Sequence, residues 1–145
     1  VKDYIEGLNL LSSMRLCSNV PAQQIVAPAL ESWPEEDPVL LPGGRIYEQR
    51  KVITSMLNDI PGVSVTHPDA AFYVFPKLDV KRFGITDDEQ FVLDFLREKH
   101  VLLVHGGGFH WPNPDHFRIV YLPEVSVLER SMQKLGEFLD GYHQH

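Results

Sequence analysis

The chain has 145 residues, of which 43% are hydrophobic and 23% are charged, a composition that excludes disordered, collagen-like and disulfide-scaffold proteins. A chain of this length buries about two-thirds of its extended surface, which is enough for one hydrophobic core. Its 20 acidic residues outweigh 13 basic ones, for a formal charge of −7, and this disfavours nucleic acid as a partner because nucleic-acid binding needs clustered positive charge.

The number of cysteines and the hydropathy of the chain indicate the cellular compartment in which it functions. The single cysteine, Cys17, cannot form an internal disulfide, which is typical of a reducing compartment. No apolar run reaches the length of a transmembrane helix, and the opening residues 1–4 do not resemble a signal peptide. We therefore expect a cytoplasmic protein with no membrane partner. The start at Val1 leads us to expect a piece of a longer protein.

The first part of the chain is predicted to form two helices. Residues 1–16 place apolar side chains at near-helical spacing. Ser18 or Asn19 can cap a second helix, with Pro21 tolerated in its first turn. Pro28 removes one internal hydrogen bond from this second helix, which is therefore expected to be short.

A break and a third helix follow. Trp33-Pro34 is predicted to end the second helix, and the acidic run at 35–38 is interpreted as a solvated loop rather than a partner site. Beyond the glycines at 43–44, residues 46–60 carry apolar side chains three, four or seven positions apart. This spacing predicts an amphipathic helix that ends at Pro61-Gly62.

Four strands are predicted in the remainder of the chain. Residues 63–66 alternate as in a half-exposed strand, whereas the continuously apolar residues 70–75 and 101–104 are typical of fully buried strands. Residues 116–122 alternate again, and this last strand places Phe117, Ile119 and Tyr121 on one face.

Two further helices complete the predicted order. Residues 86–89 have the spacing of a capping box ahead of an apolar helix face, and residues 125–139 carry the apolar stripe of a closing helix. From residue 43 the order is helix, two strands, helix, two strands, helix. Two hairpin-like pairs with helices between them imply an α+β fold with helices covering one face of a sheet.

The run Gly106–Gly108 is interpreted as a strand end where the backbone turns or approaches another segment closely. A dinucleotide-binding fingerprint would need a further glycine at position 111, where Trp111 stands. The residues after it also contain two prolines and cannot begin a helix cleanly. A phosphate-binding loop is therefore disfavoured.

Metal-binding and hydrolytic sites are also disfavoured. Four histidines fall within seventeen residues, but their intervals match no common ligand frame; they are His100, His105, His110 and His116. No Gly-x-Ser-x-Gly motif occurs, and Cys17 has no catalytic motif around it. We predict neither a metal site nor a nucleophilic hydrolase.

Arg118 is the most informative residue, because its strand carries apolar side chains on both faces and its guanidinium is therefore expected to be partly buried. A buried cation requires an anionic partner. One interpretation is an internal ion pair with an acid such as Asp115 or Glu124. The other is a planar fork that binds a carboxylate or phosphate of a ligand through two hydrogen bonds. The residues alone leave both interpretations open.

Several segments resemble the C-terminal part of the class I/II aminotransferases, in particular their bacterial alanine (glutamate–pyruvate) branch. The resemblance covers essentially the whole chain in order. It is carried by residues 43–50, 58–63, 71–77 and 111–120.

This resemblance implies a cytoplasmic, homodimeric, fold-type I enzyme that uses pyridoxal 5′-phosphate and acts on an L-amino acid and a 2-oxo acid, with alanine and glutamate as the expected donors. Residues 1–31 would connect to a large domain absent from the chain, and residues 32–145 would form the small C-terminal domain. In the family an arginine of the Phe-Arg-Ile strand holds the substrate α-carboxylate, and that position is Arg118. The resemblance thus favours the ligand fork, with the loop at 106–109 beside it.

Two departures from the family qualify what the chain can do. The family's Schiff-base lysine lies in a Ser-Lys motif upstream of the matched segments, and the aspartate and tyrosine that contact the cofactor ring are upstream too. None of the lysines present has such surroundings: Lys2, Lys51, Lys77, Lys81, Lys99 and Lys134. We assign no catalytic, cofactor-binding or metal-binding residue within the chain, and expect it to be inactive alone. Arg15 lies near a distal-carboxylate position of related enzymes but is out of register with it.

Two alternatives remain at this point. The chain could be a non-catalytic α+β binding or regulatory domain in which Arg118 forms an internal ion pair. It could also belong to an aromatic or aspartate branch of the same family.

Overall fold

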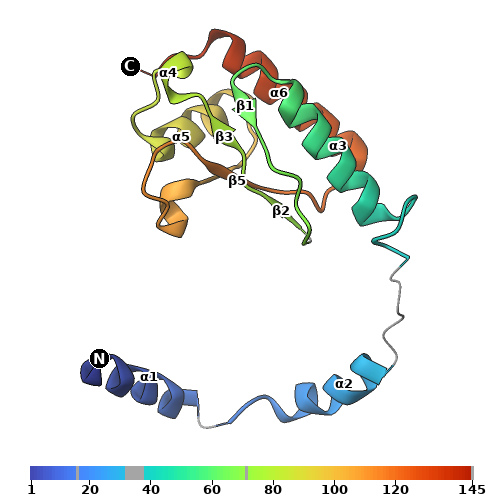
Figure 1. The fold of residues 1–145 in the computed structure, drawn as a ribbon, viewed down its shortest axis with the longest axis vertical. Coiled ribbons are helices and arrows are strands. Elements are labelled where there is room, and N and C mark those ends of the chain that lie inside the picture. Colours follow the sequence, from blue (N-terminus) through green and yellow to red (C-terminus); the bar gives the residue numbers. More distant parts are fainter. Residues whose placement is uncertain (16, 32–37, 71, 145) are drawn as a thin grey trace. The chain divides into compact units, whose positions relative to one another are not determined.

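A computed structural model describes residues 1–15, 17–31, 38–70 and 72–144. The chain forms two units, Val1–Asp37 and Pro38–His145, and each is described by itself (Figure 1). The predicted helix end at Trp33-Pro34 and residues 35–37 of the predicted acidic loop lie outside the described residues.

The first unit contains helices α1 (Lys2–Arg15) and α2 (Val20–Glu31). Asn19 accepts the N–H of Ala22 at 3.2 Å, which confirms the predicted cap. Helix α2 continues through Pro28 to Glu31 and is the shorter of the two helices, with 12 residues against 14; the fixed φ of proline is itself compatible with a helix. Neither helix contains a buried side chain, and Cys17 between them is exposed.

The second unit is an α+β structure, as predicted. Its helices and strands occur in the following order: α3 (Arg45–Asp59), β1 (Val63–Ser64), β2 (Tyr73–Val74), β3 (Lys77–Leu78), α4 (Val80–Phe83), α5 (Asp88–Lys99), β4 (Val104–His105), the 3₁₀ helix η1 (Gly106–Phe109), β5 (Phe117–Val120) and α6 (Val125–Gly141). The side chain of Asp87 caps α5 by accepting the N–H of Gln90 at 3.0 Å. The cap therefore lies one residue later than the capping-box spacing predicts.

The strands form two small antiparallel sheets, one of β1 and β3 and one in the order β2-β5-β4. In the larger sheet Val74 pairs with Ile119 and Val104 pairs with Arg118. The predicted pairing of the last two strands is confirmed. The predicted hairpin between the first two strands is wrong, because β1 pairs with β3 instead, a two-residue strand too short to leave a sequence pattern.

The two apolar runs predicted as fully buried strands are shorter and more exposed than expected. Within residues 70–75 only Tyr73–Val74 form a strand, and Tyr73 is 48% exposed; residue 71 lies outside the described residues. Within residues 101–104 only Val104 joins a strand, and Leu102 is 73% exposed. Tyr73 and Val120, which pair with each other across β2 and β5, are both exposed, so this face of the sheet is open in the described structure.

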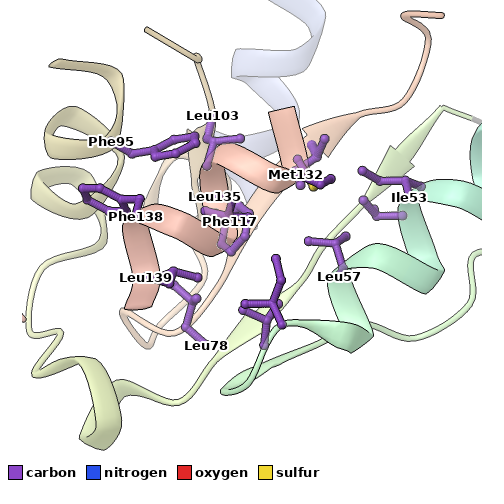
Figure 2. Close-up of a cluster of buried hydrophobic side chains, with 14 of the residues drawn as sticks. Ile53, Leu57, Leu78, Phe95, Leu103, Phe117, Met132, Leu135, Phe138 and Leu139 are labelled. Carbon is purple, nitrogen blue, oxygen red and sulfur yellow. The ribbon is translucent and has the colours of Figure 1, made fainter. Parts of the chain in front are cut away.

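The hydrophobic core lies on the other face of the sheet, where the helices pack (Figure 2). Phe117, Ile119 and Tyr121 are buried there, and the ring of Phe91 from α5 lies 5.7 Å from that of Phe117. Helix α6 runs beside α3 (Figure 1) and contributes its predicted stripe to the core: Leu128, Met132, Leu135 and Leu139, with Phe138. None of the described helices has the length and apolar content needed to span a bilayer.

Candidate functional site

Arg118 lies on the open face of the three-stranded sheet. It is half-buried in β5 between the buried residues Phe117 and Ile119. Because side chains alternate across a strand, the burial of these two neighbours directs Arg118 to the opposite face. The core thus fixes where the guanidinium projects.

Two aromatic rings lie against the guanidinium of Arg118. Its Cζ atom is 4.6 Å from the ring centroid of Tyr73 and 4.3 Å from that of Phe109. Such cation–π contacts contribute about 0.5–2 kcal/mol each. The rings come from β2 and η1, so three segments distant in the sequence meet at this cation. Rings over the guanidinium leave its N–H groups, which lie in the plane, available to an acceptor.

Arg118 has no acidic partner in the part of the chain that the structure describes. Its Nε atom is buried without a hydrogen bond there. Asp115 instead contacts Lys77 at 3.6 Å and His116 at 2.7 Å, and Glu124 stands at the start of α6. The alternative interpretation, an internal ion pair with Asp115 or Glu124, is therefore not formed among the described residues. A half-buried cation without a counter-charge is suited to an anionic ligand.

A pocket of about 280 Å³ opens beside this cation. Its walls come from β2, η1 and β5, and the lining residues are Tyr73, Val74, Phe75, Phe109 and Arg118. Apolar walls with one polar anchor are typical of small-molecule sites. The arrangement suits a small molecule that carries an anionic group next to an apolar part.

The glycine run forms η1 and confirms the close-approach interpretation. The Gly106 N–H donates to the His116 carbonyl at 2.9 Å, and a Cβ atom on Gly106 would lie 2.8 Å from that oxygen. The Gly107 N–H donates to the Asp88 carboxylate at 2.7 Å. An acid of the chain thus already occupies the Gly107 amide, which is therefore not open to a phosphate.

The four histidines do not converge. No group of three or more metal-ligating side chains occurs among the described residues. His100 and His110 sit at the ends of α5 and η1 with left-handed backbone conformations. His105 lies 3.8 Å from Asp88, and His116 stacks on Phe75 with centroids 4.9 Å apart.

A second polar centre is Asp115, which lies beside Trp111 and His116. It accepts hydrogen bonds from the Trp111 indole at 2.8 Å and from His116 at 2.7 Å. Burial by itself raises the pKa of the Asp115 carboxyl, but the hydrogen bonds from His116 and Trp111 and the nearby charges of His116 and Lys77 hold that pKa below its usual range. The carboxylate is thus committed to neighbours within the fold.

Sequence reasoning identified Arg118 but missed the residues around it. Tyr73 and Phe109 were hidden within apolar or glycine-rich runs, and Asp88 was interpreted only as part of a helix start. Exposed aromatic residues beside an arginine without an acidic partner are the feature that identifies this site. That feature becomes visible only when the fold brings the residues together. Arg15 is exposed in the first unit, and none of the lysines lines the Arg118 pocket.

Comparisons with known proteins give a consistent result. No family model matches the chain. The glutamate-pyruvate aminotransferase AlaA of Escherichia coli is 55% identical over 99% of this chain and 35% of its own length. The alanine aminotransferase of Mycobacterium tuberculosis H37Rv is 48% identical over 97% of this chain and 33% of its own length.

A solved structure agrees. An aminotransferase from Escherichia coli superposes with a TM-score of 0.87 and 54% identity, covering the whole of this chain and 36% of that one. The chain thus spans about one third of the length of the relatives that it matches. Its fold is that of the C-terminal domain of these proteins.

Proposed function

We propose a function for this chain on the premise that it belongs to the aminotransferase family. It acts as the carboxylate-binding C-terminal domain of an enzyme, and that enzyme moves an amino group between an L-amino acid and a 2-oxo acid. The observation that carries the proposal is Arg118, a half-buried cation with no acidic partner among the described residues. The alanine and glutamate-pyruvate names of the relatives at 48–55% identity support alanine and glutamate as amino donors.

Arg118 is proposed to hold the α-carboxylate of the amino acid. A carboxylate matches the planar fork of a guanidinium and accepts two parallel hydrogen bonds from it. A fixed carboxylate in turn fixes the direction of the Cα–H bond, so the contribution of Arg118 to the reaction is orientation. The pocket beside it has room for a short side chain such as the methyl group of alanine.

Aminotransferases depend on pyridoxal 5′-phosphate, which supplies the electron sink for the reaction when bound. The residues described here do not fit that group on their own, because no lysine lines the Arg118 pocket. Lys77, the first residue of β3, is instead paired with Asp115 at 3.6 Å. We propose that the cofactor is held by residues outside these 145, and that the 145 residues alone catalyse no transfer.

The test is Arg118→Lys in the full-length enzyme that carries this domain. We expect kcat/KM for alanine to fall on the order of 100-fold, because an ammonium cannot make the paired hydrogen bonds. The absorbance of the bound cofactor should not change. Arg130→Lys, at an exposed position of α6, is the matched control. An unchanged kcat/KM in Arg118→Lys would overturn the proposal.

The same proposal also covers the amino donor, the cellular location and the oligomeric state of the full-length enzyme. A panel of alanine, aspartate and aromatic amino donors on the full-length enzyme distinguishes the branches, and we expect alanine to give the highest kcat/KM. We further propose a cytoplasmic homodimer, as the resemblance implies. Sedimentation of the full-length enzyme at several concentrations tests the dimer.

A further inference from the structure

The guanidinium of Arg118 ends a long side chain that must be held still to bind a carboxylate through two hydrogen bonds. Ordering such a side chain loses up to about 2 kcal/mol of conformational entropy. In the described structure no ion pair orders it. What holds it are the two rings, Tyr73 at 4.6 Å and Phe109 at 4.3 Å.

Phe109 is the nearer ring, and its own support is indirect. It is 44% exposed and touches Phe75 edge-on, with centroids 6.3 Å apart. It ends η1, whose three preceding residues are glycines. Glycines bring no side chains with which to anchor a loop, and they give the backbone wide conformational freedom. The position of Phe109 therefore depends on what holds the η1 backbone.

Asp88 holds that backbone from helix α5. Its carboxylate accepts the Gly107 N–H at 2.7 Å, and the side chain is 14% exposed. Asp88 is the first residue of α5, a helix fixed by the fully buried rings of Phe91 and Phe95. The Gly106 N–H adds a bond to the backbone of His116 at 2.9 Å. Asp88 thus links the rigid core to the η1 backbone through a side-chain hydrogen bond.

We propose that Asp88 and Phe109 are positioning residues for Arg118: Asp88 fixes η1, η1 fixes the Phe109 ring, and the ring holds the guanidinium in the plane that receives the substrate carboxylate. This inference rests on the proposed function, because it concerns the orientation of the same carboxylate-binding group. It adds a specific set of contacts that connects the core to the site. One of them is the hydrogen bond between Asp88 and Gly107, which are 19 positions apart in the sequence.

The first test replaces the ring. In the full-length enzyme, Phe109→Leu should raise KM for alanine about tenfold, within the range of a lost cation–π contact, while kcat changes less than about twofold. Phe109→Tyr keeps a ring over the guanidinium and should restore the original KM. A Phe109→Leu enzyme with unchanged KM, or no rescue by tyrosine, would overturn the role of the ring.

The second test removes the tether and uses a matched control. Asp88→Ala should raise KM for alanine about fivefold, and hydrogen exchange at the Gly107 amide should become at least about tenfold faster. Asp88→Asn keeps an oxygen acceptor and should leave both quantities near those of the wild type. Glu89→Ala removes an exposed acid from the same first turn of α5, one that makes no hydrogen bond to η1 among the described residues, and should also change neither quantity.

The outcomes separate the two proposals. If Arg118→Lys lowers kcat/KM but Asp88→Ala leaves KM and Gly107 exchange unchanged, the positioning route is wrong and the proposed function stands. If Asp88→Ala speeds exchange without raising KM, the tether is structural only and the inference fails. If Arg118→Lys has no effect, the proposed function itself fails.

Discussion

The two faces of the three-stranded sheet differ in what covers them, although their residues alternate along the same strand. On one face Phe117 and Ile119 of β5 are buried against the helices. On the other, Arg118 is half-buried and Val120 is 37% exposed. The covered face is expected to supply stability, and the open face leaves a cation and exposed rings available to a ligand.

The comparison shows how a small sheet can serve both purposes. A buried apolar side chain contributes about 1.5–3 kcal/mol through removal from water, whereas an exposed one contributes little. Because β5 is the central strand, with β2 and β4 on its two sides, its geometry is fixed from both edges. The Arg118 side chain is therefore held in a defined direction, although it is not itself part of the core. Substitutions on the two faces should therefore have separable effects.

The largest effect on stability is expected from Phe117→Ala. This side chain is fully buried (0% exposed) and contacts Phe91, so its removal should lower the free energy of unfolding by about 3–5 kcal/mol. Urea unfolding of the chain measures the change. Val120→Ala, three positions along the strand and on the open face, is the control and should lower the free energy of unfolding by less than about 1 kcal/mol. Equal losses for the two variants would refute the division between the faces.

A smaller loss is expected from Tyr121→Phe on the covered face. The Tyr121 hydroxyl donates to the carbonyl of Ala70 at 3.0 Å. Removing one such hydrogen bond lowers the free energy of unfolding by about 1 kcal/mol, and the exposed position of Ala70 lets water replace the lost donor. Urea unfolding again provides the measurement. A loss as large as that of Phe117→Ala would show that the hydroxyl, not the ring, dominates at this position.

A contribution to stability that is present at neutral pH and lost in acid is expected from Asp115. Its pKa is held below the usual range by hydrogen bonds from His116 and Trp111 that outweigh the effect of burial. A lowered pKa in the folded state gives stability that is present above the ordinary carboxyl pKa of about 4 and is lost as the pH falls through the lowered value.

The measurement is the free energy of unfolding against pH for the wild type and for Asp115→Asn. The two curves should differ most near neutral pH and converge in acid. Asp140→Asn, at an exposed position of α6, serves as the reference variant. Curves for Asp115→Asn and wild type that stay parallel down to about pH 2 would contradict the assignment.

The smallest effect on stability is expected from Arg118→Gln. The variant loses its contacts with Tyr73 and Phe109 but also relieves the burial of an unpaired cation. The free energy of unfolding should change by less than about 1 kcal/mol. A loss above about 3 kcal/mol would mean that Arg118 supports the fold, and it would remove the basis for reading the open face as a binding face.

Long periodic segments of the fold were predictable because each carries its own pattern. The stripe of α6 and the alternation of β5 are repeated over several residues, so the physical signal is strong. Strand β1 lies within the predicted alternation at 63–66, but β3 contains only two residues and has no pattern of its own. The pairing of β1 with β3 joins residues 63–64 to residues 77–78, and no local rule predicts it.

The candidate site divides in the same way. Arg118 was predictable as an unusual cation in an apolar strand. Its lack of an acidic partner was not, because Asp115 lies three positions away but is held by Trp111 and His116. Phe109 and Asp88 were not predictable either, since each acts through a contact with a segment distant in the sequence. Such contacts exist only once the fold has formed.

The environment of Trp111 has a practical consequence. Its indole donates a hydrogen bond to Asp115, and its ring centroid lies 4.5 Å from that of His116. The ring of Phe75 contacts both Trp111 and Phe109. Trp33 is the other tryptophan of the chain. In a Trp33→Phe background, the intrinsic fluorescence of Trp111 would serve as an optical reporter of the Arg118 pocket, with no dye attached.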